Sequence, residues 1–157
     1  MIQRIEVDLL RRDDREAVVE MLASSSDFDQ SLMRQYSSAG AYETLFAHQG
    51  SRVEGVVSGS FHGDLHDSRE FAQFTLPPGP HGFLARVHVR DAARGQGVGR
   101  ALIEAYAARA SLFRCTFVGG FIDRSADLRA RTHFFKKVGF TVKSNDVLGA
   151  NIEDLLT

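Results

Sequence analysis

The stretch from Val87 to Leu102 most constrains the fold, because it joins a β-branched strand end to a helix through a turn rich in glycine. The turn contains Gly95, Gly97 and Gly99. Glycine has no Cβ, so the backbone at these positions can approach a ligand closely. The helix that follows presents unpaired N–H groups and the positive end of its dipole. The stretch therefore predicts a strand, an anion-binding turn and a helix.

The spacing of the glycines narrows the choice of phosphate ligand. A Walker loop needs a Lys-Ser or Lys-Thr pair after its last glycine, and Gly99 is followed by Arg100. A dinucleotide-binding turn reads Gly-x-Gly-x-x-Gly, and here the third glycine comes one place too early. The residues instead fit Arg-x-x-Gly-x-Gly, filled by Arg94, Gly97 and Gly99 behind the strand residue Val89.

A second pattern lies at residues 133–140, where a helix ends in an aromatic residue, two polar residues, an apolar residue and then Gly139-Phe140. Alone it also fits an amphipathic helix closed by a glycine. In this order the two patterns resemble the GCN5-related N-acetyltransferases, the GNAT superfamily, and the resemblance covers most of the chain. It implies one α/β (α+β) domain over residues 1–157, with a mixed, mostly antiparallel sheet splayed between its fourth and fifth strands and helices on both faces.

The hydrophobic periodicity predicts the order β-α-α-β-β-β-α-β-α-β-β, which is also the GNAT order. Gly50-Ser51 indicates a hairpin turn, and residues 62–80 read as a polar loop that ends in a proline-rich segment. The strands are expected at 2–8, 44–49, 52–61, 82–89, 115–122, 139–144 and 147–154, and the helices at 12–24, 27–37, from the glycine turn to about 111, and 126–138.

The resemblance implies acetyl-CoA as co-substrate. Its pyrophosphate would lie on backbone N–H groups of Gly95 to Gly99, flanked by Arg94 and Arg100, and its pantetheine arm would pair with the backbone around Val87 to Val89. The two arginines are otherwise read as a solvated pair at the helix entry. The candidate cofactor-binding residues are Val87, His88, Val89, Arg94, Gly95, Gln96, Gly97, Val98, Gly99, Arg100 and Phe135.

The implied reaction is acetyl transfer to an amine by direct attack in a ternary complex. An alkyl amine with a pKa of about 10.4 is neutral in roughly one molecule per thousand or fewer at pH 7, so a base should help. Where relatives carry a base on the strand before the loop, this chain has Ala85 and Phe83. His88 is a candidate base, although a lone strand histidine is more often a packing residue. We therefore assign no catalytic residue.

The general acid is also missing from the pattern, because Phe135 stands where many relatives have a tyrosine. A thiol pKa of about 8.5 still makes thiolate a tolerable leaving group, so a slow enzyme is expected. Normal turnover that is lost when a different tyrosine, Tyr42 or Tyr106, is changed to Phe would contradict this expectation. The alternative is a non-catalytic acyl-CoA-binding or sensor domain that has lost both the acid and the base. A third reading is an acyltransferase for longer acyl chains.

The acceptor is expected at residues 61–81 and 27–37. His62, Asp64 and His66 alternate there, which allows a base, a metal pair or three solvated side chains, and we assign no metal. Acidic residues of the same loop, Asp64, Asp67 and Glu70, would favour a cationic amine or be merely solvated.

The net charge of −1 argues against nucleic acid and anionic membranes as partners. We expect a small-molecule or peptide amine, and the resemblance allows a homodimer. No apolar run is long enough to cross a bilayer, so a cytoplasmic location is predicted. The single cysteine, Cys115, is interpreted as a buried apolar residue rather than a nucleophile.

Overall fold

The computed structural model describes residues 4–10, 14–23, 42–124 and 127–156. The chain divides into two compact units, the first made of residues 1–58 and 86–105 and the second of residues 59–85 and 106–157. β3 (Arg52–Gly63), β4 (His81–Val89) and α3 (Val98–Leu112) contribute residues to both units. The helix expected at 27–37 lies outside the described residues.

The described strands form one sheet in the order β1-β2-β3-β4-β5-β7-β6. β4 pairs with β5 in parallel, whereas β1 with β2, β5 with β7, and β6 with β7 pair antiparallel. The predicted mixed, mostly antiparallel sheet is therefore confirmed. The remaining strands are β1 (Glu6–Leu9), β2 (Glu43–Gln49), β5 (Phe117–Phe121), β6 (Thr141–Lys143) and β7 (Val147–Asn151).

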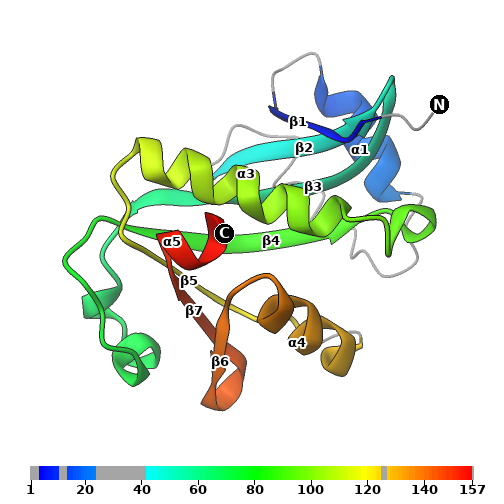
Figure 1. Ribbon diagram of the computed structural model, residues 1–157. Helices are drawn as coiled ribbons and strands as arrows, with labels where there is room; N and C mark the ends of the chain where they lie inside the picture. The colour runs from blue at the N-terminus through cyan, green and yellow to red at the C-terminus, as the bar shows by residue number, and fades with distance from the viewer. Residues whose placement is uncertain (1–3, 11–13, 24–41, 125–126, 157) are drawn as a thin grey trace. The chain divides into compact units, whose positions relative to one another are not determined.

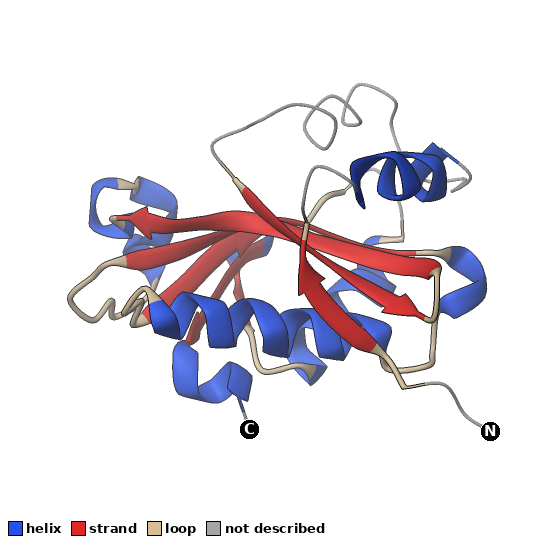
Figure 2. Ribbon diagram, turned by 90° about the horizontal axis from the view of Figure 1, so that it is seen from above, coloured by secondary structure: helices blue, strands red, loops and turns tan. Residues whose placement is uncertain are grey.

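In the first unit, helices cover both faces of the strands (Figure 2). Val18 and Met21 of α1 (Arg15–Ala23) pack in one buried cluster with Phe46, Val53 and Val56 of the sheet. The opposite face of β3 packs against α3, since a Cβ on Gly55 would lie 3.1 Å from the Leu102 side chain of that helix. Side chains alternate along a strand, so Glu54 and Val56 face away from α3.

In the second unit, β5 and β7 lie side by side (Figure 1), with Phe117 opposite Asn151 and Phe121 opposite Val147. The parallel register of β4 with β5 runs from His81 opposite Phe117 to Leu84 opposite Gly120. β4 itself continues to Val89. The parallel ladder thus covers the first part of β4 only.

The segment predicted as a polar loop contributes to the core of the second unit, which corrects the sequence-based expectation. Its 3₁₀ helices η2 (Leu65–Asp67) and η3 (Arg69–Gln73) bury Leu65 and Phe71. A Cβ on Gly119 would lie 2.7 Å from the Leu65 side chain and 2.5 Å from the Phe71 side chain. Leu65 and Phe71 are isolated apolar residues in a polar segment, so they show no hydrophobic period in the sequence. They are buried because Gly119 on β5 has no side chain and leaves room for them.

The predicted strand at 147–154 is too long, and this expectation is also corrected. β7 ends at Asn151, and α5 (Ile152–Leu156) follows directly. Ile152 and Leu155 are buried at 6% and 1% exposure. Their spacing of three residues places them on one side of a helical turn. In the sequence, a short apolar segment of this kind fits a helix and a strand equally well.

α4 (Leu128–Lys137) begins at Asp127, whose side chain accepts a hydrogen bond from the Ala130 N–H (3.1 Å). At its end the Phe140 N–H donates to the Phe135 carbonyl (3.0 Å), and the Gly139 N–H donates to the Lys136 carbonyl (3.2 Å). These bonds form a Schellman motif with Gly139 at a φ of 118°. The Phe135 and Phe140 rings, 5.6 Å apart, complete it.

We expect Gly139→Ala to destabilise the protein by roughly 2–3 kcal/mol, because alanine would be strained at this φ. Its Cβ would also lie 2.4 Å from the Asp154 carbonyl oxygen. Urea unfolding measures the change. Gly63→Ala is the control, since among the described residues a Cβ there would meet only the His81 carbonyl oxygen, at 3.4 Å. Equal, small effects of both substitutions would contradict the capping role.

Candidate functional site

The glycine turn is anchored where β4 ends. The Arg90 N–H donates to the Glu54 carbonyl (2.8 Å), so pairing with β3 extends to the last residue before the turn. One 3₁₀ turn, η4 (Asp91–Ala93), follows, and Ala93 is 1% exposed. The chain therefore enters the glycine segment from a fixed direction.

Gly95 and Gly97 have φ angles of 78° and 86°, a region that favours glycine. A Cβ at either position would meet nothing within 4 Å among the described residues. Both glycines are exposed. Glycine is therefore needed here for its backbone angles and not to avoid a neighbouring side chain. The turn faces open space, as a turn that binds an external group would.

α3 begins directly behind this turn. Its first helical hydrogen bond runs from the Ala101 N–H to the Gly97 carbonyl (3.0 Å), so the N–H groups of Val98, Gly99 and Arg100 precede it. The buried Val98 fixes the helix start. In the first turn, described in full, there is no acidic side chain, and Arg100 is present. This charge pattern leaves the positive end of the helix dipole for an external anion.

Arg94 is held at the edge of the turn. Its side chain is 52% exposed, with Nη2 3.2 Å from a carboxylate oxygen of Asp91. Its Nε lies 3.4 Å from the Val89 carbonyl oxygen. Gln96 is exposed, and its side chain donates to the Ala92 carbonyl (3.3 Å). The turn itself therefore orients a cationic and a polar side chain beside the exposed glycines.

The structure places the predicted cofactor-binding residues from Val87 to Arg100 in one continuous segment of the first unit. Phe135 belongs to the second unit, where its half-buried ring contacts Phe134 and Phe140 at centroid distances of 5.1 Å and 5.6 Å. Its hydrocarbon ring carries no ionisable group. The roles assigned to these residues stay predictions.

The candidate proton-transfer residues differ in their surroundings. His88 is 8% exposed, as the packing interpretation predicts. Tyr106 is fully buried and donates its hydroxyl to the Ser60 carbonyl (3.0 Å), so it has a structural role, whereas Tyr42 is 41% exposed. Burial raises the pKa of the Cys115 thiol, which favours the apolar interpretation over a thiolate nucleophile.

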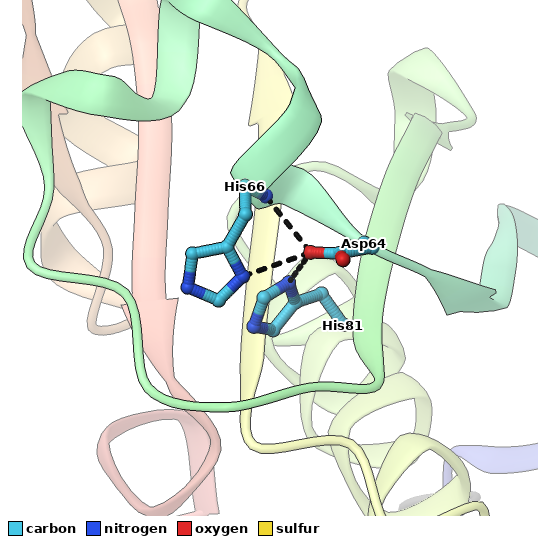
Figure 3. Close-up of side chains that lie close together, drawn as sticks. All are labelled: Asp64, His66 and His81. Carbon is cyan, nitrogen blue, oxygen red and sulfur yellow. Dashed lines mark hydrogen bonds and ion pairs between the residues drawn. The ribbon is translucent and has the colours of Figure 1, made fainter.

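The alternating residues Asp64 and His66 do come together, and the buried His81 joins them in place of His62 (Figure 3). His66 Nδ1 donates to Asp64 Oδ1 (2.8 Å), and the His66 backbone N–H donates to the same oxygen (3.0 Å). These bonds hold the pKa of the exposed Asp64 carboxyl below its usual value. His62 instead contacts the ring of Phe113 at 5.0 Å.

His81 is a neutral histidine in this arrangement. Its Nδ1 accepts the Leu65 N–H (2.9 Å), so its Nε2 carries the proton and donates to the Pro77 carbonyl (2.8 Å). A metal ion bound by all three side chains would have to displace the Leu65 N–H. The geometry is therefore explained by hydrogen bonds that hold η2 against the start of β4. No sequence period pointed to His81, because its partners are mostly backbone atoms.

Glu6, Asp8 and His48 form a second cluster, on β1 and β2. His48 Nε2 lies 2.6 Å from Asp8, and its Nδ1 lies 3.1 Å from the Gly50 carbonyl oxygen. Both partners are acceptors, so both hydrogen bonds are made when the His48 ring is protonated. The hydrogen bond to Asp8, aided by Gly50, raises the pKa of His48 above its ordinary value. Protonated His48 thereby ties the edge strand β1 to β2.

This pair predicts a pH-dependent stability. A raised pKa in the folded state contributes stability that is fully present below the unfolded pKa of about 6.5 and is lost as the pH rises through the folded value. We expect the difference in unfolding free energy between the wild type and His48→Gln to shrink as the pH rises above about 6. Urea unfolding across the pH range measures it. His133→Gln, at an exposed site on α4, is the control; a His48 difference that grows with pH would contradict the assignment.

The comparisons with known proteins agree with this geometry. The family model described as "Acetyltransferase (GNAT) family" matches residues 8–140. The match covers most of the chain and both sequence patterns. The chain belongs to the GNAT acetyltransferase family.

Several solved structures share the fold. PaiA N-acetyltransferase from Thermoplasma acidophilum, in complex with coenzyme A, aligns over 94% of this chain and 99% of its own with a TM-score of 0.69 and 15% identity. An acetyltransferase of the GNAT family from Staphylococcus aureus aligns over 95% and 99% with a TM-score of 0.70 and 11% identity. Ribosomal-protein-alanine N-acetyltransferase from Brucella melitensis aligns over 86% and 90% with a TM-score of 0.65 and 17% identity.

Curated protein sequences give no match to this chain. Each helix among the described residues is too short or too polar to cross a bilayer.

Proposed function

We propose that this protein is an acetyl-CoA-dependent N-acetyltransferase that acts on the amine of a small molecule or peptide. The observation that carries the proposal is the glycine turn, in which Gly95 and Gly97 face open space immediately before the N-terminus of α3. Membership of the GNAT family supports it. The residues suit the co-substrate, because the turn leads into the N-terminus of α3, the first turn of that helix has no acidic side chain, and Arg94 and Arg100 flank the glycines in the sequence.

In this proposal each part of the segment has a task. The N–H groups of the turn and of the first turn of α3 hold the pyrophosphate, and Arg94 and Arg100 flank it. The backbone of Val87 to Val89 pairs with the pantetheine arm as an added strand would. An N–H of this strand faces the oxygen of the thioester carbonyl and stabilises the charge that develops there.

Acetyl-CoA supplies an activated acyl group as its thioester. The neutral amine nitrogen forms a bond to the carbonyl carbon, the carbon–sulfur bond breaks, and the amine proton passes to a base or to water. Phe83 and Ala85 offer no base, so we propose a water relay. Phe135 offers no acid, so the thiolate is protonated by solvent and turnover is slow.

A non-catalytic acyl-CoA-binding domain is the second candidate. It is favoured by the surroundings of Phe135 and Tyr106: the former contacts aromatic rings, and the hydroxyl of the latter is engaged by Ser60. Release of free thiol from acetyl-CoA in the presence of an amine panel separates the two candidates. We further propose a single domain, a cytoplasmic location and, as an option, a homodimer.

The cradle is tested by Gly97→Asp and Gly97→Asn, two substitutions of nearly equal shape at a φ of 86°. Both incur the same backbone strain, and only aspartate adds a negative charge where the pyrophosphate would lie. We expect Gly97→Asp to bind acetyl-CoA and free CoA at least about tenfold more weakly than Gly97→Asn, as isothermal titration measures. Equal affinities would contradict the cradle. Wild type that binds neither compound would overturn both candidate functions.

The missing acid predicts a gain of activity. Phe135→Tyr restores a hydroxyl at the position where many family members have their general acid, and it is expected to raise kcat by roughly 10-fold or more. Phe134→Tyr adds the same hydroxyl to the neighbouring half-buried ring and is the control. Thiol release under saturating acetyl-CoA measures kcat. An unchanged kcat in Phe135→Tyr would show that the position does not serve proton transfer.

A further inference from the structure

The first unit contains a buried ion cluster that the proposed function does not use. Glu54 on β3 is fully buried, and its side chain is 1% exposed. One of its carboxylate oxygens accepts from Arg52 Nε, and the other accepts from Arg90 Nη2 (2.9 Å). Both oxygens of this buried carboxylate are thus bonded to a guanidinium group.

Arg86 lies on β4, and Arg90 follows directly after the strand ends at Val89. Arg90 reaches Glu54, and Glu54 faces away from α3. Gly82, near the start of β4, faces α3, since a Cβ there would lie 3.0 Å from the Tyr106 hydroxyl, so the side chains do not alternate without interruption from Gly82 to Arg90. The end of β4 and the residue after it contain three basic residues, Arg86, His88 and Arg90.

The Nε atom of Arg86 is the part of this guanidinium that the described residues leave unsatisfied. This Nε is buried and has no hydrogen-bond partner among the described residues, and the same is true of Arg90 Nε. Both oxygens of Glu54 are taken by the other two arginines. A buried N–H of a charged group without a partner is costly, and such atoms in folded proteins usually mark a bound ion, water or ligand.

The position of Arg86 separates it from the phosphate cradle. It lies four residues before Arg90 on an extended strand, which is about 13 Å at 3.3 Å per residue. The cradle begins only after Arg90, at Arg94. An anion at Arg86 would therefore belong to the second substrate rather than to the pyrophosphate. Arg86 itself is half-buried, so it can be reached from solvent.

We propose that Arg86 binds a carboxylate of the acceptor, so that the acceptor is an amine that also carries a carboxylate, such as an amino acid or a short peptide. This proposal rests on the proposed acetyltransferase function. The planar fork of a guanidinium matches a carboxylate, with paired N–H donors on one edge. The bound carboxylate supplies the hydrogen-bond partner that Arg86 Nε lacks among the described residues.

The test uses a panel of free amino acids, the matching amino-acid amides, and O-phosphoethanolamine as a phosphate-bearing amine. Binding is measured by isothermal titration with and without CoA, because affinity does not depend on the nucleophilicity of the amine. Wild type is expected to bind one or more carboxylate members about 10- to 100-fold more tightly than their amides. Equal binding of acids and amides, or binding of the phosphate-bearing amine alone, would overturn the proposal.

Arg86→Gln is expected to remove the preference for the carboxylate while leaving the affinity for acetyl-CoA unchanged. Arg129→Gln removes the same charge at an exposed site on α4 and should keep the preference. If Arg86→Gln does not fold, Arg86→Lys replaces it, since lysine keeps the charge and loses the paired donors. A preference retained in the folded variant would overturn the proposal.

The two levels of inference fail differently. Loss of acetyl-CoA binding in wild type would overturn the acetyltransferase function and would leave the carboxylate measurement without CoA unaffected. Acetyl-CoA binding and thiol release with no difference between acids and amides would keep the acetyltransferase function and overturn the role of Arg86.

Discussion

The ion cluster at Glu54 is the constraint on which the first unit depends. A fully buried carboxylate is tolerated only when it is paired and hydrogen-bonded, and here Arg52 and Arg90 meet both oxygens. Arg90 also donates its backbone N–H to the Glu54 carbonyl. Side chain and backbone together fix the end of β4, so the glycine turn starts from a defined point and its N–H groups face a defined direction.

Glycine serves different physical purposes in the two units. Gly95 and Gly97 provide left-handed backbone angles beside open space, which suits a ligand. Gly119 and Gly149 lie in strands where a Cβ would overlap aromatic side chains, at 2.5 Å from Phe71 and 2.6 Å from Phe74. These strand glycines let aromatic rings pack directly on the backbone. A glycine count alone could not separate the two uses.

The functional interpretation follows from which charges are satisfied and which are not. Asp64, His66 and His81 look like a metal or proton-transfer site, but the Leu65 N–H occupies the His81 nitrogen that faces Asp64. Arg86 shows the reverse, since it is a half-buried cation whose buried Nε lacks a partner among the described residues. Because a buried polar group without a partner costs free energy, the second arrangement points to a ligand more strongly than the first.

The amino-acid sequence by itself determined the strand, glycine turn and helix of residues 87–102, the family, and the mixed sheet, because glycine spacing and hydrophobic period are local properties. The pattern at residues 133–140 also fitted a helix closed by Gly139, as one of two interpretations. Only the tertiary structure decided that Phe71 enters the core, that His81 joins Asp64, and that Glu54 pairs with Arg90 while Arg86 Nε has no partner among the described residues. Those outcomes depend on contacts between residues distant in the chain, and the pairing and burial of a charge are set by its neighbours in space.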